Sequence, residues 1–78
     1  MKYERIRNLR EDKDLTQTDI AEYLHTSQRT YSRYENDERA IPIEILSLLA
    51  DYHHTSTDYL IGRTDIKEAY PPRKRSKE

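Results

Sequence analysis

The sequence predicts an all-α domain built from five short helices. The chain has 78 residues, of which 33% are hydrophobic and 37% are charged, and it contains one glycine and three prolines. A chain of this length has room for a single domain with a small core. Because charged residues are frequent and glycine is nearly absent, the composition favours amphipathic helices over strands joined by tight turns.

Apolar residues at helical spacing and polar residues at helix starts define the five helices. Ile6 and Leu9, for example, are three positions apart and share one face of the first helix. Thr16, Ser27 and Ser56 are residue types common at the N-cap, where a side-chain oxygen accepts a hydrogen bond from a backbone N–H. The helices are expected over residues 3–12, 17–24, 28–35, 42–52 and 57–61.

Further residues mark where the helices begin and end. Asp19, three positions after the second N-cap, completes a variant of the capping box, which usually has Glu or Gln there. Pro42 suits the first turn of the fourth helix, and Gly62 stands where a left-handed C-terminal cap is expected. Beyond this glycine the pattern fades. We therefore expect one compact domain over residues 1–64 and a disordered basic tail over residues 65–78.

The composition also indicates the cellular compartment of the protein. The chain has no cysteine, so it can form neither a disulfide nor a thiolate metal site. Its first residues lack the apolar core of a signal peptide, and no stretch is long enough to span a bilayer. These features predict a cytoplasmic protein that does not contact a membrane.

Two adjacent short helices carry the strongest functional signal. They are joined by a turn of about three residues, and Ala21 in the first is small enough to let the second cross close by. Tyr31 and Tyr34 are expected to fill the corner between the two helices. This spacing predicts a helix-turn-helix unit of the DNA-binding kind. The alternative is an ordinary helical hairpin.

On these motifs the chain resembles the Cro and lambda-repressor-like helix-turn-helix proteins, also called the xenobiotic response element family. The resemblance covers roughly residues 3–64, which implies a lambda-repressor-like fold for the domain. No single motif is specific, but together they are. They stand at residues 6–10, 15–21, 27–36, 40–42, 49–52 and 58–63.

The resemblance implies that the helix over residues 28–35 is the recognition helix, whose N-terminal end enters the major groove. The expected base readers are Gln28, Arg29, Ser32 and Arg33. A glutamine amide can pair with adenine through two hydrogen bonds, and arginine can grip guanine or phosphate. Serine is the weaker candidate.

Phosphate contacts are expected from residues around that helix. By resemblance, Gln17 contacts phosphate and also braces Gln28, although simple surface polarity is the alternative for it. Thr30, Asn36 and Arg39 are the other candidates, since such contacts fix register without reading sequence. For Arg39 a solvated loop charge is nearly as good an explanation.

Two further expectations follow from the resemblance. Arg10 and Glu35 occupy positions that form an ion pair in several relatives, so we expect that pair here. His25 and Asp37 replace glycines that are usual in the family. Both residue types tolerate a left-handed backbone better than most, so the turns should form at some cost.

The distribution of charge is compatible with a DNA partner, although the net charge is only −1. Residues 1–10 and 71–78 each carry four basic side chains against one acidic side chain, so the segment between them carries about −7. Because one face meets DNA, overall neutrality argues only against strong nonspecific binding. The basic tail could contact phosphates or only keep the chain in solution.

No catalytic site, metal site or cofactor is expected. His53 and His54 near Asp51 could suggest a metal, but histidine at a helix C-terminus is ordinarily a capping choice, and the zinc-type ligand spacing is missing. The chain has no cysteine nucleophile and no glycine-rich phosphate loop.

The resulting prediction is a sequence-specific regulator, a repressor that blocks a promoter by occupying double-stranded DNA. Two alternatives stay open. One is an antitoxin that neutralises a protein partner and autoregulates its operon. The other is a DNA-binding module that serves an enzyme complex.

A homodimer on DNA is also expected, because one short recognition helix offers few base contacts. The candidate dimer patch is an apolar flank of the fourth helix with one residue from the fifth. If instead residues 64–70 cover this flank, the patch is not exposed. The patch consists of Ile45, Leu48, Tyr52 and Ile61.

Overall fold

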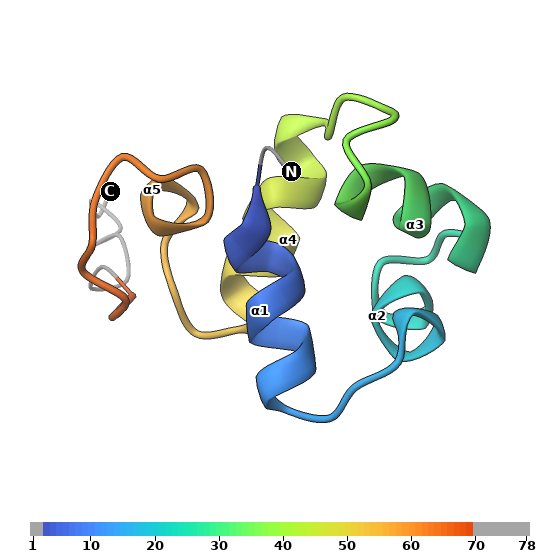
Figure 1. Ribbon diagram of the computed structural model, residues 1–78, viewed down its shortest axis with the longest axis horizontal. Helices are drawn as coiled ribbons and strands as arrows, with labels where there is room; N and C mark the ends of the chain where they lie inside the picture. Colours follow the sequence, from blue (N-terminus) through green and yellow to red (C-terminus); the bar gives the residue numbers. More distant parts are fainter. Residues whose placement is uncertain (1–2, 70–78) are drawn as a thin grey trace, which may run out of the picture.

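The computed structural model describes residues 3–69, and its helices match the number and order expected from the sequence (Figure 1). The part of the chain that the structure describes contains no strand, so the all-α, five-helix prediction is confirmed. None of these helices is long and apolar enough to cross a membrane. The helices are α1 (Glu4–Asp12), α2 (Gln17–Tyr23), α3 (Gln28–Glu35), α4 (Ile43–Tyr52) and α5 (Thr57–Leu60).

Four predicted helix boundaries are wrong by one residue. Tyr3, expected inside α1, is its N-cap, and Pro42 is the N-cap of α4 with an extended ψ of 149°, so its ring precedes the first turn. Leu24 and Ile61, expected as last helical residues, are the C-caps of α2 and α5. The capping box at Thr16 formed as expected, since both of its reciprocal hydrogen bonds to the aspartate are present.

Each of the five helices ends in a Schellman motif. After α2, for example, the N–H groups of His25 and Thr26 return to the carbonyls of Glu22 and Ala21 at 3.2 and 3.0 Å. The first residue past each C-cap must then adopt a left-handed conformation, which glycine adopts most easily. The five residues are Asp14 (φ 55°), His25 (57°), Asp37 (61°), His54 (55°) and Gly62 (84°). The left-handed turns expected at His25 and Asp37 are therefore present.

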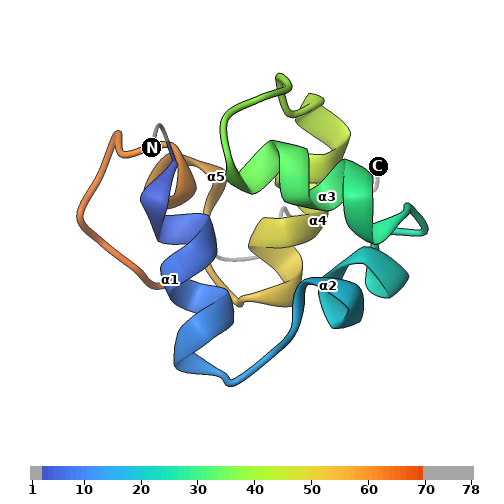
Figure 2. The same cartoon turned by 45° about the vertical axis from the view of Figure 1, so that its right-hand side comes forward.

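The core lies among the five helices. In Figure 1, α1 and α4 lie between α2 and α3 on one side and α5 on the other, and the turned view of Figure 2 shows α1 and α5 to the left of α2, α3 and α4. Every helix contributes at least one buried hydrophobic side chain to it. Leu46 is half-buried and packs against the edge of the core. The buried hydrophobic residues are Ile6, Leu9, Ile20, Ala21, Leu24, Tyr31, Tyr34, Leu49, Ala50 and Leu60.

The segment after α5 is tied back to the domain. Arg5 Nη2 pairs with the Asp65 carboxylate at 2.7 Å, and the Thr55 hydroxyl donates a hydrogen bond to the Lys67 carbonyl. The first part of the predicted tail therefore contacts α1 and the α4–α5 connection. Residues 70–78, to which the predicted disorder also applies, lie outside the described residues.

His53 is a buried histidine whose proton position follows from its neighbours. It is the C-cap of α4, is 4% exposed, and meets the ring of Tyr52 edge-on at 5.2 Å. The Lys13 ammonium lies 3.1 Å from His53 Nδ1. An ammonium can only donate, so Nδ1 accepts and the proton resides on Nε2, which has no hydrogen-bond partner among the described residues. Burial, with the positive charge of Lys13, lowers the pKa of His53 to about 4.

This histidine should make the fold sensitive to mild acid. Its pKa is about 4 in the folded chain but about 6.5 when unfolded, so the unfolded chain takes up a proton first as the pH falls. The free energy of unfolding should fall from pH 6.5 to about pH 4, by at most about 1.4 kcal/mol per pH unit. Urea unfolding at pH 7 and pH 5 measures this loss. The His53→Phe variant should lose less free energy of unfolding between pH 7 and pH 5 than the wild type. Equal losses would contradict a lowered pKa of His53 as the cause.

Candidate nucleic-acid interface

The recognition helix α3 separates its buried side chains from those that the sequence assigns to DNA. Tyr31, Tyr34 and Glu35 point into the domain and are at most 7% exposed. On the other side, Gln28 and Arg29 are exposed, and Ser32 and Arg33 are half-buried. The four expected base readers thus lie together on the solvent side of one helix, beginning at its N-terminal residue.

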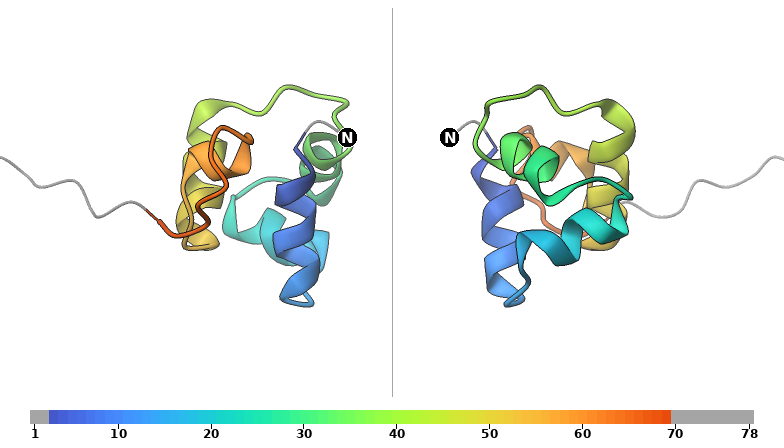
Figure 3. Two further views of the ribbon diagram at one scale, coloured as in Figure 1. Left: turned by 60° about the vertical axis from the view of Figure 1, so that its left-hand side comes forward. Right: turned by 90° about the vertical axis from the view of Figure 1, so that its right-hand side faces the viewer.

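A tight elbow between α2 and α3 holds that surface in place. The two helices lie one above the other and are joined by a short turn (Figure 3, right). Ala21 is 2% exposed within the core, as expected of the small residue that the sequence predicts where the two helices cross. The N-cap Ser27 accepts a hydrogen bond from the Thr30 N–H at 3.1 Å, so α3 begins at a defined residue.

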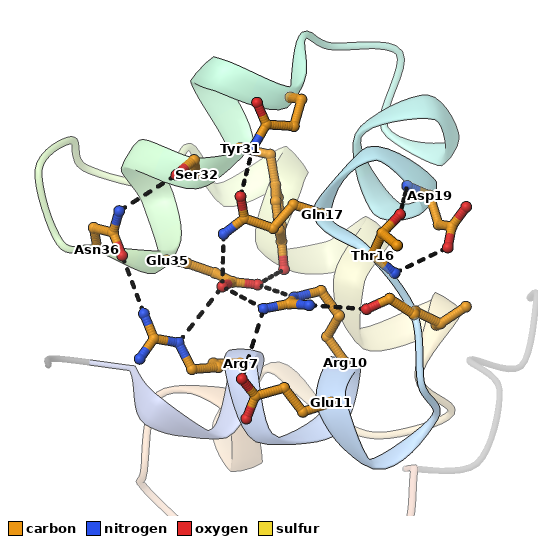
Figure 4. Close-up of polar contacts among 12 residues, drawn as sticks. Arg7, Arg10, Glu11, Thr16, Gln17, Asp19, Tyr31, Ser32, Glu35 and Asn36 are labelled. Atoms are coloured by element: carbon orange, nitrogen blue, oxygen red, sulfur yellow. Dashed lines mark hydrogen bonds and ion pairs between the residues drawn. The ribbon is translucent and has the colours of Figure 1, made fainter.

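The buried carboxylate of Glu35 lies at the centre of a polar network that joins three helices (Figure 4). Its Oε2 accepts from Arg10 Nε at 2.6 Å and from the Tyr31 hydroxyl at 2.5 Å. Its Oε1 accepts from Arg10 Nη2 and from Gln17 Nε2, both at 3.2 Å. The structure therefore brings Arg10 and Glu35 together, and Glu35 itself is 1% exposed.

These hydrogen bonds keep the carboxylate ionised. Burial alone would raise the pKa of Glu35, but the hydrogen bonds from Arg10, Tyr31 and Gln17 outweigh burial and lower it. The hydrogen bond to this carboxylate raises the pKa of Arg10. Burial and the same carboxylate raise the pKa of Tyr31, so its hydroxyl stays protonated and donates. The network is thus a charged anchor at any pH near neutrality.

Gln17 connects this anchor to the first residue of the recognition helix. While its Nε2 donates to Glu35, its Oε1 accepts from Gln28 Nε2 at 2.6 Å. A primary amide has two N–H donors and one carbonyl, and this bond uses one donor of Gln28. The other donor and the carbonyl are the pair that the major-groove edge of adenine requires. The arrangement therefore orients the Gln28 amide while leaving it the groups needed to read a base.

At the other end of α3 the structure adds a residue that the sequence analysis missed. Arg7 Nη2 donates to Asn36 Oδ1 at 3.1 Å, and Asn36 Nδ2 donates to Ser32 Oγ at 3.3 Å. Arg7 Nε also lies 3.7 Å from Glu35 Oε1. The available signal was spacing, because Arg7 is three residues before Arg10 and so shares its face of α1.

The expected phosphate contacts occupy different environments. Asn36 and Arg39 are exposed at and beyond the end of α3, and Gln17 is half-buried at the start of α2. Thr30 is half-buried, and its hydroxyl accepts a hydrogen bond from Ser27 at 2.9 Å, so it also belongs to the cap of α3. The candidate phosphate contacts therefore come from α2, from α3 and from the residues that follow α3.

The candidate dimer patch is only partly exposed. Leu48 is 37% exposed, whereas Ile45 and Tyr52 are half-buried against the core. Tyr52 also packs on Tyr23 of α2, with ring centroids 4.6 Å apart, and Tyr23 is 39% exposed. Ile61 lines an open pocket against the start of α1. The apolar surface that remains exposed here therefore includes a residue of α2 that the sequence analysis did not assign to it.

The short helix α2 braces α3, and the solvent face of α3 begins with a glutamine and carries two arginines. This arrangement defines a helix-turn-helix domain of the DNA-binding class. A protein-family model described as "Helix-turn-helix" matches residues 6–60, so the chain belongs to this family. This match confirms the resemblance on which the sequence analysis relied. None of the solved structures matches the chain.

The chain is similar to three HTH-type transcriptional regulators of Bacillus subtilis (strain 168). It is 33% identical to YobD, described as uncharacterized, over 96% of this chain and 67% of that protein. It is 34% identical to AnsR over 91% of this chain and 61% of that protein. It is 31% identical to ImmR over 82% of this chain and 50% of that protein. The matched part of the chain thus spans between half and two thirds of these relatives. The domain is of the kind found in DNA-binding transcriptional regulators.

Arg10→Ala should destabilise the fold strongly, because it leaves the Glu35 carboxylate buried without its main partner. The Arg10 and Glu35 side chains are 13% and 0% exposed. Breaking a buried pair costs about 3 to 5 kcal/mol, against about 0 to 1 for a surface pair. Thermal unfolding measures the difference. The double variant Arg10→Ala, Glu35→Gln should recover part of the loss, because no unpaired carboxylate remains in the interior. An unchanged melting temperature for Arg10→Ala would show that the pair contributes little.

Proposed function

We propose that this domain acts as a repressor, which binds an operator in double-stranded DNA and blocks a promoter by occupying it. The observation that supports this most is the chain of contacts from Arg10 through Glu35 and Gln17 to Gln28. It orients the first side chain of α3 before any DNA is bound. Less conformational freedom is then lost on binding, which favours affinity for one particular sequence.

Base recognition would come from the solvent side of α3. Gln28 would pair with adenine through the amide groups that Gln17 does not use, and Arg29 and Arg33 would pair with guanine. The half-buried hydroxyl of Ser32 would make a weaker contact. Gln17, Thr30, Asn36 and Arg39 would contact phosphates and fix the register of the helix without reading sequence.

Repression is the simplest way for such a domain to regulate, since a protein that covers a promoter excludes polymerase without further machinery. The similarity to HTH-type transcriptional regulators supports a role in transcription. Selection of bound sequences from a random duplex pool would identify the operator. Transcription in vitro from a promoter that overlaps this site should then fall as protein is added. Unchanged or increased transcription would contradict repression.

We also propose that the domain binds as a homodimer, because two linked half-sites add their contacts. The proposed contact surface consists of Ile45, Leu48, Tyr52 and Ile61. Partial exposure of Leu48 and of the neighbouring Tyr23 supports it, since the segment after α5 leaves this apolar area accessible. Such a dimer would recognise a near-palindromic site.

Gln28→Ala and Arg33→Ala should each weaken binding to the selected operator by about 1 to 3 kcal/mol and relax the preference at one base pair. Each loses base-edge hydrogen bonds that a wrong base cannot make. Arg39→Ala is the matched control, and it should weaken all duplexes alike. Titration of operator and random duplex measures both effects. If Gln28→Ala and Arg33→Ala weakened the two duplexes equally, their base-reading role would be excluded.

Sedimentation with operator duplex should give two protomers per duplex. The selected operator should contain two half-sites whose centres are about 10 base pairs, or roughly 34 Å, apart. Leu48→Glu places a charge in the proposed contact and should weaken binding of the second protomer. Glu44→Gln, an exposed change at the start of the same helix, serves as the control. One protomer per operator at saturation would rule out the dimer.

A further inference from the structure

Two guanidinium groups share the Glu35 carboxylate unequally, and Arg7 is the more loosely paired of the two. Two guanidinium groups, those of Arg10 and Arg7, approach this single carboxylate at 2.6 and 3.7 Å. Arg10 is committed to the interior, because it donates to both carboxylate oxygens and to the Leu15 carbonyl at 2.8 Å. Arg10 also lies 3.9 Å from the exposed carboxylate of Glu11. Arg7, whose ion pair with Glu35 is the longer one, is the less tightly paired guanidinium.

Arg7 is held in a fixed direction at the surface. Its side chain is 41% exposed, and its Nη2 donates to Asn36 Oδ1 at 3.1 Å. Asn36 is held in turn by its hydrogen bond to Ser32 Oγ. A guanidinium has five N–H donors in a planar fork, so one hydrogen bond and one loose ion pair leave enough donors for two bonds to a phosphate. Figure 4 shows Arg7 reaching from α1 to Asn36 and Glu35.

The C-terminal end of α3 would repel a backbone phosphate if no positive charge lay near it. Asn36 directly follows α3, whose C-terminal end carries the negative pole of the helix dipole. Asp37 and Glu38, both exposed, come next in the chain. A phosphate that approaches the end of α3 therefore needs a nearby positive charge that is only loosely paired with a carboxylate. Arg7 supplies such a charge.

We propose that Arg7, although it lies on α1 and outside the helix-turn-helix unit, binds a DNA backbone phosphate and that Asn36 positions it to do so. The proposal rests on the DNA binding proposed above and names a residue for it. The Arg7 guanidinium makes the charged contact, and the Asn36 amide keeps it at the end of the recognition helix. The contact is independent of sequence and sets how α3 is seated in the groove.

The salt dependence of binding tests this proposal, because each phosphate contact changes the slope of log K against log salt by about 0.9. Arg7→Gln should flatten the slope by about that amount on operator and random duplex alike. Its deficit in affinity should therefore shrink about threefold between 50 and 200 mM salt. Arg7→Lys keeps the charge and should keep the slope. Arg63→Gln removes an exposed charge from the segment after α5, which Figure 1 shows across the molecule from α3, and should leave the slope unchanged.

A structural role for Arg7 gives a different result. If Arg7 only tied α1 to α3, Arg7→Gln would lower the melting temperature and leave the salt slope as in the wild type, which would overturn the proposal. Asn36→Asp, made alone and together with Arg7→Gln, provides a second measurement, because Asn36 is also a candidate phosphate contact. In the single variant, its carboxylate should neutralise the guanidinium and flatten the slope more than it does when Arg7 is absent. An equal change in both backgrounds would count against the proposal. A wild-type chain that binds no duplex would refute the proposed function itself.

Discussion

The three N-terminal helices depend on one buried carboxylate. Glu35 belongs to α3 and accepts hydrogen bonds from Arg10 of α1, Gln17 of α2 and Tyr31 of its own helix. A buried carboxylate is tolerated only when its oxygens are satisfied, so these partners must be in place at the same time. The requirement positions α1, α2 and α3 relative to one another more narrowly than apolar packing alone, which tolerates many arrangements of similar volume.

The same carboxylate links the stability of the domain to its outer surface. Gln17 carries the connection to the N-terminal end of α3 through Gln28, and Arg7 carries it to the C-terminal end through Asn36. Both ends of the helix face that would meet DNA are therefore oriented from one interior point. A functional site built in this way is preorganised, because the groups that orient it are themselves held by the fold.

The helices themselves are short, from four to ten residues, and such helices are marginal in isolation. Their ends are consequently well defined. Thr16, Ser27 and Ser56 cap the starts of three helices, and all five ends close in the same left-handed turn. Four of these turns use a residue other than glycine, at some cost in backbone energy. Packing of the helices against each other has to offset that cost.

The sequence by itself determined the number, order and approximate limits of the helices, the elbow at Ala21 and the face of α3 that carries Gln28 and Arg33. These features depend on capping side chains, turn residues and helical spacing, which act over about four residues and can be read along the chain. Membership of the helix-turn-helix family could also be predicted from the sequence, because the family is defined by such local motifs in a fixed order.

The family resemblance implied the Arg10–Glu35 and Gln17–Gln28 contacts, but only the tertiary structure decided the other contacts between residues far apart in the chain. Arg7 meets Asn36 across 29 positions, and Lys13 meets His53 across 40. The segment near Asp65 joins the domain through Arg5, 60 positions away. Composition and spacing identify these side chains as polar, but which of them meet depends on how the helices pack and on the direction each side chain takes from its helix. The packing of the helices fixes these side-chain directions, and the spacing of residues along the sequence does not.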